Sequence, residues 1–330
     1  MKTKSFTLIE LLVVIVIIGV LAGVITLSVS SNISKAQDLK ISSTILSISK
    51  TLKADSYDSF PIEVAACNLK NSCATLKARI DLPNITEDIY YKTSSSGKFF
   101  VIYTNKPSNT SLSFEITSID ENVKEVPSFD NLVAYYPLAV GAANGTAISD
   151  MSPNANNGTN NGASSATGAD GNVGTAMSFD GVNDYITCGD IELNGQKNLT
   201  ISIWFTQSSS CVAWRDVFSF GLNKFRLEAV SNPLNFMIYD AGIIPNGIML
   251  PFVITDGWNN FVFTSDENNW NVYLNGEKIT SGATIDGLNG NIFYIGARSE
   301  LSFSYKGSVG DARIYNRALS QEEITLLYEK

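Results

Sequence analysis

The side chains of this 330-residue chain that could do chemistry are mostly oxygen ligands, because the chain contains no histidine. Without histidine, Ser-His-Asp and Cys-His catalysis is excluded, together with the commonest zinc and copper ligand. The stretch "DMSPNAN" places side-chain oxygens at alternate positions, namely Asp150, Ser152, Asn154 and Asn156. Calcium takes roughly six to eight such oxygens, but the same residues also form ordinary turns. The pattern predicts a calcium loop or a plain turn, and we favour calcium.

A charged residue, Glu10, stands at the edge of an apolar segment. Every residue in 11–25 is apolar, Ala or Gly. As a helix, residues 6–29 would span ~36 Å, which is enough for a bilayer. The preceding Lys2 and Lys4 place that end on the cytoplasmic side. The segment is therefore predicted to be a cleaved signal peptide, a membrane anchor, or a helix whose carboxylate has a function, since charges at membrane depth are costly.

The N-terminal stretch resembles a type IV prepilin, whose hallmark is a short basic leader, then F-T-L-I-E, then an apolar helix. Phe6 matches the first mature residue and Glu10 the fifth. The resemblance covers roughly the first 50 residues. It implies that a membrane-bound prepilin peptidase cuts after Ser5 and methylates the new amine of Phe6. The residue before the cut is usually Gly, and Ser5 is a small replacement. The apolar helix is then retained in the mature protein.

In a filament of this family the apolar helices pack side by side. Glu10 would then lie in a low dielectric, with the α-amine of a neighbouring Phe6 as its counter-ion. Such a buried pair adds little net stability but fixes the register between subunits. Gly19 and Gly23 form a G-x-x-x-G pattern that permits close helix approach, although glycines are common in membrane helices without any such role.

The segment after the apolar run predicts a second, amphipathic half of the same helix. Apolar residues recur at helical spacing at Ile41, Ile45, Ile48 and Leu52. The breaker stretch "DSYDSFP" ends the helix near Asp55. Three strand patterns follow, "DIYYKTS", "KFFVIYT" and "LSFEITSI", and they predict a small antiparallel sheet under the helix. The stretch "DENVKEVPSFDN" is predicted to be a linker.

The C-terminal part predicts a β-sandwich. Short strand patterns recur between Asn/Gly turns, including a hairpin turn at Asn275-Gly276. The stretches "LVAYYPL", "AMSFDGVNDYITC", "VYLNGEKI" and "GSVGDARIYNRALSQEEITLLY" occur in this order. They resemble the laminin-G-like, concanavalin A-like jelly-roll domains of bacterial surface proteins over residues 132–328. The resemblance implies carbohydrate or protein ligands and a structural calcium, and it adds Asp311 to the predicted calcium ligands.

Four cysteines permit three pairings. We favour Cys67–Cys73 and Cys188–Cys211, because each pair then stays within one domain. Disulfides require an oxidising compartment. Buried free thiols are the alternative.

Two tryptophans, Trp214 and Trp270, lie at the ends of predicted strands and could form a weak ligand platform, although core packing is the favoured interpretation for both. Trp204 and Trp258 are predicted to be core. The catalytic Glu-x-Asp-x-x-Glu pattern of concanavalin A-like glucanases does not occur in the sequence. A net charge of −9 without a basic stripe argues against nucleic-acid binding.

The predicted fold class is α+β: a long pilin helix with a small antiparallel sheet, followed by an all-β jelly-roll sandwich. The expected segments are a leader at 1–5, a spine helix at 6–55, a small head at 56–126 and the sandwich at 127–330. The predicted function is a non-enzymatic filament subunit, minor or tip, that displays a lectin-like domain for adhesion. It would start in the inner membrane, bind other pilin subunits and end in an extracellular filament. The alternatives are a secretion pseudopilin, a major pilin with a decorative sandwich, and, more weakly, a tethered carbohydrate-active enzyme.

Overall fold

The computed structural model describes residues 8–55, 59–63, 65–79, 82, 85–191, 193, 195–207, 214–221, 225–231, 235–240, 244–253, 257–283, 287–288, 290–298 and 301–329. Side chains are described for most of these residues from Ser31 onward. The predicted processing residues Ser5 and Phe6 therefore lie outside the described residues. For Glu10, Gly19 and Gly23 the structure describes the backbone alone.

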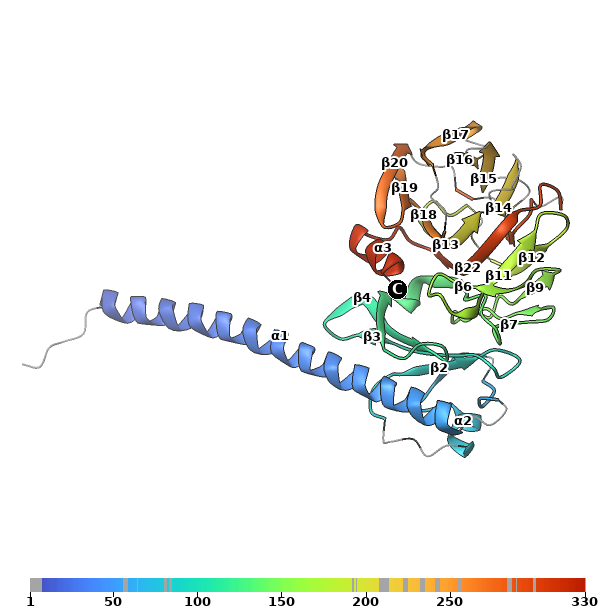
Figure 1. The fold of residues 1–330 in the computed structure, drawn as a ribbon. Coiled ribbons are helices and arrows are strands. Elements are labelled where there is room, and N and C mark those ends of the chain that lie inside the picture. Colours follow the sequence, from blue (N-terminus) through green and yellow to red (C-terminus); the bar gives the residue numbers. More distant parts are fainter. Residues whose placement is uncertain are drawn as a thin grey trace, which may run out of the picture.

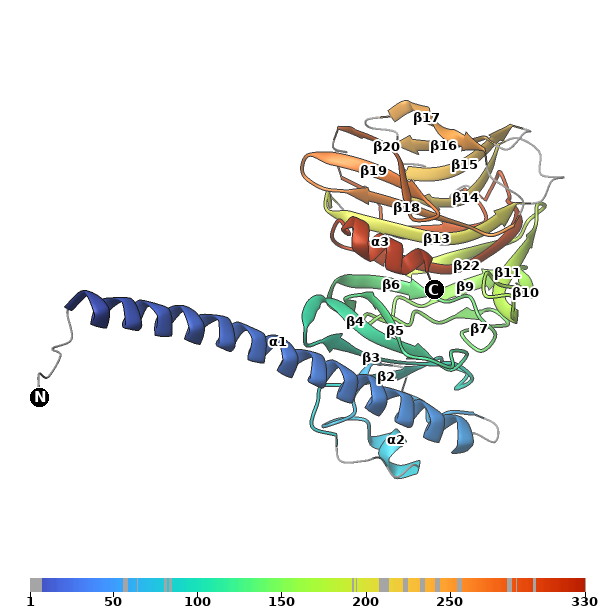
Figure 2. The same ribbon diagram turned by 60° about the vertical axis from the view of Figure 1, so that its left-hand side comes forward.

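Helix α1 (Leu8–Asp55) is 48 residues long, or ~72 Å at 1.5 Å per residue. Its N-terminal part extends away from the rest of the molecule, and its C-terminal part lies against the small sheet (Figures 1 and 2). The predicted stripe is confirmed, since each of its residues is at most 5% exposed: Ile41, Ile45, Ile48 and Leu52. Among the described residues, no helix combines the length and hydropathy needed to cross a membrane.

The head, which follows α1, is a five-stranded antiparallel sheet with strands in sequence order. Its elements are β1 (Cys67–Asn68), α2 (Ala74–Arg79), β2 (Tyr90–Thr93), β3 (Phe100–Lys106), β4 (Asn109–Thr117) and β5 (Lys124–Pro127). Cys67 and Cys73 form a disulfide across the short loop before α2. The prediction of a linker at "DENVKEVPSFDN" is wrong. This segment contains β5, which pairs with β4, and the 3₁₀ helix η1 (Phe129–Asn131).

The sandwich consists of two sheets, which we call inner and outer according to their distance from the head. The inner sheet has the order β10 (Ser164–Thr167), β11 (Val173–Asp180), β22 (Lys306–Tyr315), β13 (Leu199–Gln207), β18 (Asn259–Ser265), β19 (Asn269–Leu274) and β20 (Glu277–Ala283), and β6 (Leu132–Tyr136) also pairs with β22. The outer sheet has the order β17 (Ile244–Val253), β16 (Asn235–Asp240), β15 (Phe225–Ser231), β14 (Arg215–Phe220), β21 (Ile292–Ile295), β12 (Tyr185–Asp190), β9 (Gly158–Asn161), β8 (Ala147–Ile148) and β7 (Ala143–Asn144). Helix α3 (Gln321–Tyr328) ends the chain beside the inner sheet (Figure 2).

Strand β3 is buried on both faces, and this alternation explains how the layers stack. Phe100 and Ile102 pack toward α1 in one core. Val101 and Tyr103 point the other way and join residues of the inner sheet in a second core. A third core fills the space between the two sheets of the sandwich. The molecule is therefore a stack of helix, head sheet, inner sheet and outer sheet (Figure 1).

The second core joins the head to the sandwich without a break. Phe129 is 1% exposed and stacks on Tyr103 of the head at 4.0 Å between ring centroids. It also meets the Tyr135 ring of the sandwich edge-on at 6.5 Å. Val262 and Tyr315 of the inner sheet belong to the same cluster. Because the core is continuous, the head and the sandwich are expected to unfold together.

The second predicted disulfide, Cys188–Cys211, is wrong. Cys188 is a free thiol at 3% exposure, packed in the core between the two sheets of the sandwich. Cys211 lies outside the described residues. Burial raises the pKa of the Cys188 thiol well above its ordinary value, so the group is expected to be inert.

Replacing Phe129 by Ala should destabilise the head and the sandwich together. The change empties a site in the shared core, and such truncations cost about 3–5 kcal/mol. Urea unfolding of the detergent-solubilised full chain measures this loss, because all four tryptophans lie in the sandwich and report on it through fluorescence. The exposed Val182→Ala serves as a control and should change the unfolding free energy little. An unchanged fluorescence transition in Phe129→Ala would show that the sandwich folds independently.

Candidate functional site

The predicted calcium loop is a closed turn built around the carboxylate of Asp150. This side chain is fully buried, and its Oδ1 accepts hydrogen bonds from the backbone N–H groups of Tyr135 and Ser152, both at 2.8 Å. Its Oδ2 accepts from the Ser152 hydroxyl and the Asn156 N–H, also at 2.8 Å. Four donors thus occupy the lone pairs that a cation would need. Asp150 organises the loop and does not fit the role of a calcium ligand.

The remaining predicted calcium ligands do not converge on one point. Asn154 and Asn156 line a surface hollow, whereas Asp311 lines a different pocket and binds Arg313 at 2.8 Å. Within the described parts of the chain, no group of three or more His, Cys, Asp or Glu side chains is placed to hold a metal ion. The five predicted residues are therefore not brought together at one point, because Asp311 belongs to a separate hydrogen-bond network, and calcium binding stays a prediction.

The hollow beside this loop is lined by amides and carboxylates, and we call it the amide hollow. Its lining residues are Asp130, Asn131, Leu132, Val133, Asn154, Asn156, Asp190 and Asn316. It measures about 550 Å³ and lies where η1, the start of β6, the Asp150 loop and the end of β12 meet. Polar side chains of this kind recognise hydroxyl groups by accepting and donating hydrogen bonds.

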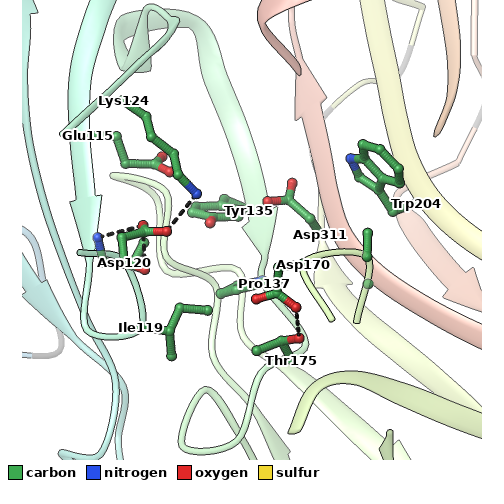
Figure 3. Close-up of a pocket in the computed structure, with 13 residues that line it drawn as sticks. Glu115, Ile119, Asp120, Lys124, Tyr135, Pro137, Asp170, Thr175, Trp204 and Asp311 are labelled. Atoms are coloured by element: carbon green, nitrogen blue, oxygen red, sulfur yellow. Dashed lines mark hydrogen bonds and ion pairs between the residues drawn. The ribbon is translucent and has the colours of Figure 1, made fainter. Parts of the chain in front are cut away.

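A second cavity, the junction pocket, lies between the head and the inner sheet (Figure 3). It measures about 90 Å³ and is lined by Glu115, Thr117, Ile119, Asp120, Lys124, Tyr135, Pro137, Ala169, Asp170, Thr175, Trp204, Gly310 and Asp311. Figure 3 shows Asp120 and Lys124 at one side of the pocket and Trp204 at the other. Its carboxylates are engaged by neighbouring protein groups: Asp170, for example, accepts a hydrogen bond from Thr175 Oγ1 at 2.6 Å.

The centre of this junction is a buried ion pair between the two parts of the molecule. Arg313 of β22 is fully buried and makes two parallel bonds of 3.0 Å to the carboxylate of Glu115 on β4. Its Nε also binds Asp311, and its guanidinium lies 3.8 Å from the centroid of the Tyr135 ring. A planar guanidinium suits such bidentate and stacked contacts. Asp311 stands at a bulge of β22, where the register with β13 shifts between Ile203 and Trp204.

A second ion pair closes the head side of the pocket. Lys124 Nζ lies 2.6 Å from Asp120 Oδ1, and Thr117 donates its hydroxyl to the other oxygen at 2.7 Å. Burial opposes the charged form of Lys124, but Asp120, followed by Glu115 and Asp311, outweighs it and raises the pKa of Lys124. Burial likewise opposes ionisation of Asp120, yet Lys124 and Thr117 lower the pKa of its carboxyl. Both groups are therefore charged at neutral pH.

The structure separates the two tryptophans predicted as a ligand platform. Trp270 is 3% exposed, so its prediction as a binding residue is wrong; its ring packs against Gly282, where any added Cβ would clash at 2.4 Å. Trp214 is 52% exposed and stands in the left-handed region with φ 64°. Trp204, which we expected in the core, is half-buried and stacks on Tyr328 at 5.8 Å.

Close to Trp214 lies a buried cluster of charges on the outer sheet. Asp216 and Glu228 are fully buried, and Arg298 binds them at 2.9 and 2.5 Å. Arg298 also lies 3.8 Å from the ring centroid of Phe303, which is 36% exposed. Burial raises the pKa of Asp216 to about 6, with Glu228 adding to the effect and Arg298 opposing it. This cluster fixes the edge of the sandwich that exposes Trp214.

Both regions of this chain with a predicted family resemblance match family models. Residues 1–26 match the prokaryotic N-terminal methylation motif, and residues 180–325 match a laminin-G family described as the concanavalin A-like lectin/glucanases superfamily. The chain joins a prepilin-type motif to a laminin-G-like domain. The prepilin-type motif implies processing by a prepilin peptidase, a membrane-anchored precursor and assembly with other pilins. No curated protein sequence matches the chain.

Solved structures similar to the laminin-G-like domain differ in sequence from this chain. Domain 4 of AbnA, a GH43 extracellular arabinanase from Geobacillus stearothermophilus, in complex with arabinotriose, is 18% identical over 60% of this chain and 98% of its own, with a TM-score of 0.47. The binding domain of Paraclostridial Mosquitocidal Protein 1 is 18% identical over 61% of this chain and 52% of its own, TM-score 0.47. Trypanosoma rangeli sialidase in complex with the inhibitor DANA is 16% identical over 76% of this chain and 45% of its own, TM-score 0.47. The chain thus spans about half the length of the latter two.

The ion pair at the junction was not predicted from the sequence, although the sequence contains a signal for it. Glu115 stands inside the strand pattern "LSFEITSI", and Arg313 stands inside "DARIYN", where neighbouring residues are buried. A charge in the middle of an otherwise buried strand must find a partner in the folded protein. Two such charges of opposite sign could have been paired from the sequence, but nothing in it shows that the two strands lie in facing sheets.

Replacing Arg313 by Met should cost about 3–5 kcal/mol of unfolding free energy, because Glu115 is then buried without its guanidinium. The double variant Arg313→Met/Glu115→Leu should recover most of that loss, since Glu115 is no longer charged and Asp311, the other carboxylate bound by Arg313, is 26% exposed and reached by water. Lys40→Ala is the control: it breaks the surface pair with Glu87, in which Lys40 is 63% exposed, and should cost at most about 1 kcal/mol. Urea unfolding measures all three. Equal losses in the single and double variants would contradict this account.

The raised pKa of Asp216 gives a stability change of defined sign. The folded protein holds this carboxyl at a pKa of about 6 against an ordinary 3.8, so it binds a proton more tightly when folded. Its contribution to stability is complete below pH 3.8 and is lost as pH rises through 6, by about 3 kcal/mol. The unfolding free energy of the wild type minus that of Asp216→Asn should therefore increase as pH falls from 7 to 4. The difference in unfolding free energy between the wild type and Val182→Ala should not change with pH. A difference between the wild type and Asp216→Asn that decreases as pH falls would contradict a raised pKa of Asp216.

Proposed function

We propose that this chain is a minor or tip subunit of a type IV pilus-like filament and that its laminin-G-like domain adheres to a glycan or protein ligand. The observation that carries the proposal is the presence of both parts in one chain. The prepilin-type motif and helix α1 supply a route into a filament. The lectin-type sandwich supplies a binding module.

The junction supports this function mechanically. An adhesive subunit must transmit force from its ligand to the filament. The continuous core and the Arg313–Glu115 pair connect the sandwich to the head, and the head packs on α1 through its own core. Every link on this path is buried, so tension would be resisted by packed layers instead of by a flexible linker.

The size of the sandwich favours a minor position in the filament. Residues 127–330 are a large addition for a subunit that repeats along a helical lattice. Two alternatives make different predictions: a major pilin with a decorative sandwich would dominate the filament by mass, and a pseudopilin would require a secretion machine. A carbohydrate-active enzyme would hydrolyse a glycan, which an assay of the full chain for released sugars would detect.

Replacing Glu10 by Ala should reduce incorporation into filaments roughly tenfold and leave the amount of protein in the membrane unchanged. The reason is that the carboxylate is proposed to pair with the α-amine of a neighbouring Phe6, which sets the register of assembly. Quantitative immunoblots of the sheared filament fraction and of the membrane fraction measure the two quantities. Glu329→Ala, a change at the exposed end of α3, is the matched control.

Three results would each contradict a part of the proposal. Normal incorporation of Glu10→Ala would remove the role of this carboxylate in register. Sheared filaments in which this chain is the most abundant protein would remove the minor or tip position. Adhesion itself is tested by comparing the binding of filaments with and without the chain to glycan-coated and protein-coated surfaces, and equal binding on every surface would contradict it.

A further inference from the structure

We propose that the amide hollow binds a neutral, polyhydroxylated sugar through direct hydrogen bonds, without a metal ion. This inference rests on the proposed adhesive function and locates its ligand site. The hollow measures about 550 Å³, which is large enough for a sugar residue, whereas the junction pocket at about 90 Å³ is not.

Two amide side chains at the hollow have a fixed orientation. Asn154 Nδ2 donates to the carbonyl oxygens of Leu132 and Val133, each at 3.1 Å. Asn156 Nδ2 donates to the same Val133 oxygen at 3.2 Å. A carbonyl can only accept, so these bonds settle which end of each amide faces the backbone. The two Oδ1 atoms must therefore point away from it, and no described residue donates a hydrogen bond to either atom.

The loop that carries these amides is held in place by buried hydrogen bonds. The four hydrogen bonds to Asp150 close the loop from Asp150 to Asn156. Lys92, which is 1% exposed, reaches from the head to donate to the Ser152 carbonyl. Tyr136 donates its hydroxyl to the Asn156 carbonyl at 2.6 Å. Acceptors that are positioned before a ligand arrives lose little entropy when it binds.

The other walls of the hollow carry polar side chains that have no hydrogen-bond partner among the described residues. The exposed carboxylate of Asp190, at the end of β12, makes no hydrogen bond or ion pair to any described residue. The side chains of Asn131 and Asn316 are likewise uncommitted, although their backbones are joined by a 3.1 Å bond. Each of these amides offers two N–H donors and one oxygen acceptor. The hollow thus presents both donors and acceptors, which is what neighbouring sugar hydroxyls require.

The charge of the lining selects the ligand class. Asp130 and Asp190 are acidic, and neither Lys nor Arg is among the lining residues. An acidic sugar would bring a carboxylate into this field without a cation to receive it, which opposes binding. Leu132 is buried in the core between head and sandwich, so the half-buried Val133 is the apolar lining residue that can meet the C–H face of a ring. A neutral sugar satisfies both conditions.

The test uses the detergent-solubilised full chain, immobilised and measured by biolayer interferometry. The probes are neutral oligosaccharides that end in galactose, glucose, mannose or N-acetylglucosamine, and the same oligosaccharides capped with sialic acid. We expect a neutral probe to bind with an affinity unchanged by a calcium chelator. Asp190→Ala should weaken that binding about tenfold or more, and Asn316→Ala about threefold to tenfold, because each removes groups that bond the ligand.

The controls separate this site from the others. Asn268→Ala removes an exposed amide on the β18–β19 turn, outside the hollow, and should leave the affinity within twofold. Asp190 and Asn316 are exposed and their side chains contact no described partner, so both variants should unfold at the same urea concentration as the wild type. Trp214→Ala tests the exposed aromatic edge of the sandwich in the same way.

The outcomes distinguish the site from the function. Binding that survives Asp190→Ala and Asn316→Ala but is lost in Trp214→Ala would overturn the amide hollow and keep the adhesive function. Binding that requires calcium, or that prefers the sialylated probes, would overturn the direct and neutral mode of recognition. Binding to no probe would overturn the hollow as a sugar site, and adhesion of filaments to protein-coated surfaces would then still support the broader function.

Discussion

A charge that is fully removed from water must find its partner inside the protein, and Arg313 finds Glu115 across the boundary between the sandwich and the head. The pair is bidentate, with both bonds at 3.0 Å, and Arg313 lies against the ring of Tyr135, which belongs to the same core as Phe129 and Tyr103. Because breaking it would leave a buried charge alone, the two parts are held in one relative position. The ion pair therefore contributes mainly to the specific alignment of the head and the sandwich, and less to the free energy of unfolding.

That alignment positions both cavities. The junction pocket exists because β4 of the head faces the bulge of β22, with Asp311 next to Arg313. The amide hollow exists because η1, at the end of the head, meets the loop that Asp150 closes. Lys92 joins the head to that loop, since it starts on the head sheet and donates a hydrogen bond to the Ser152 carbonyl. A sandwich attached by a flexible linker would have neither cavity.

The exposed aromatic edge of the sandwich is built differently from the hollow. Trp214 and Phe303 are both exposed. Both also adopt left-handed backbone conformations, which non-glycine residues seldom do. Below them, Asp216 and Glu228 share Arg298 in a buried cluster. Strain and buried charge both oppose folding, so this edge is held by the rest of the outer sheet. The hollow uses no such strain and relies on ordinary amide geometry.

The sequence by itself determined the parts of this protein: the methylation motif, the amphipathic stripe ending at Leu52, the strands, the Asn275-Gly276 hairpin and the Cys67–Cys73 disulfide. These features depend on local periodicity, turn chemistry and short loops. The tertiary structure alone decided that the expected linker is a strand, that Cys188 is free and that Asp150 holds a loop closed through four hydrogen bonds. Those outcomes depend on contacts between residues far apart in the chain, and local patterns carry no information about which distant surfaces meet.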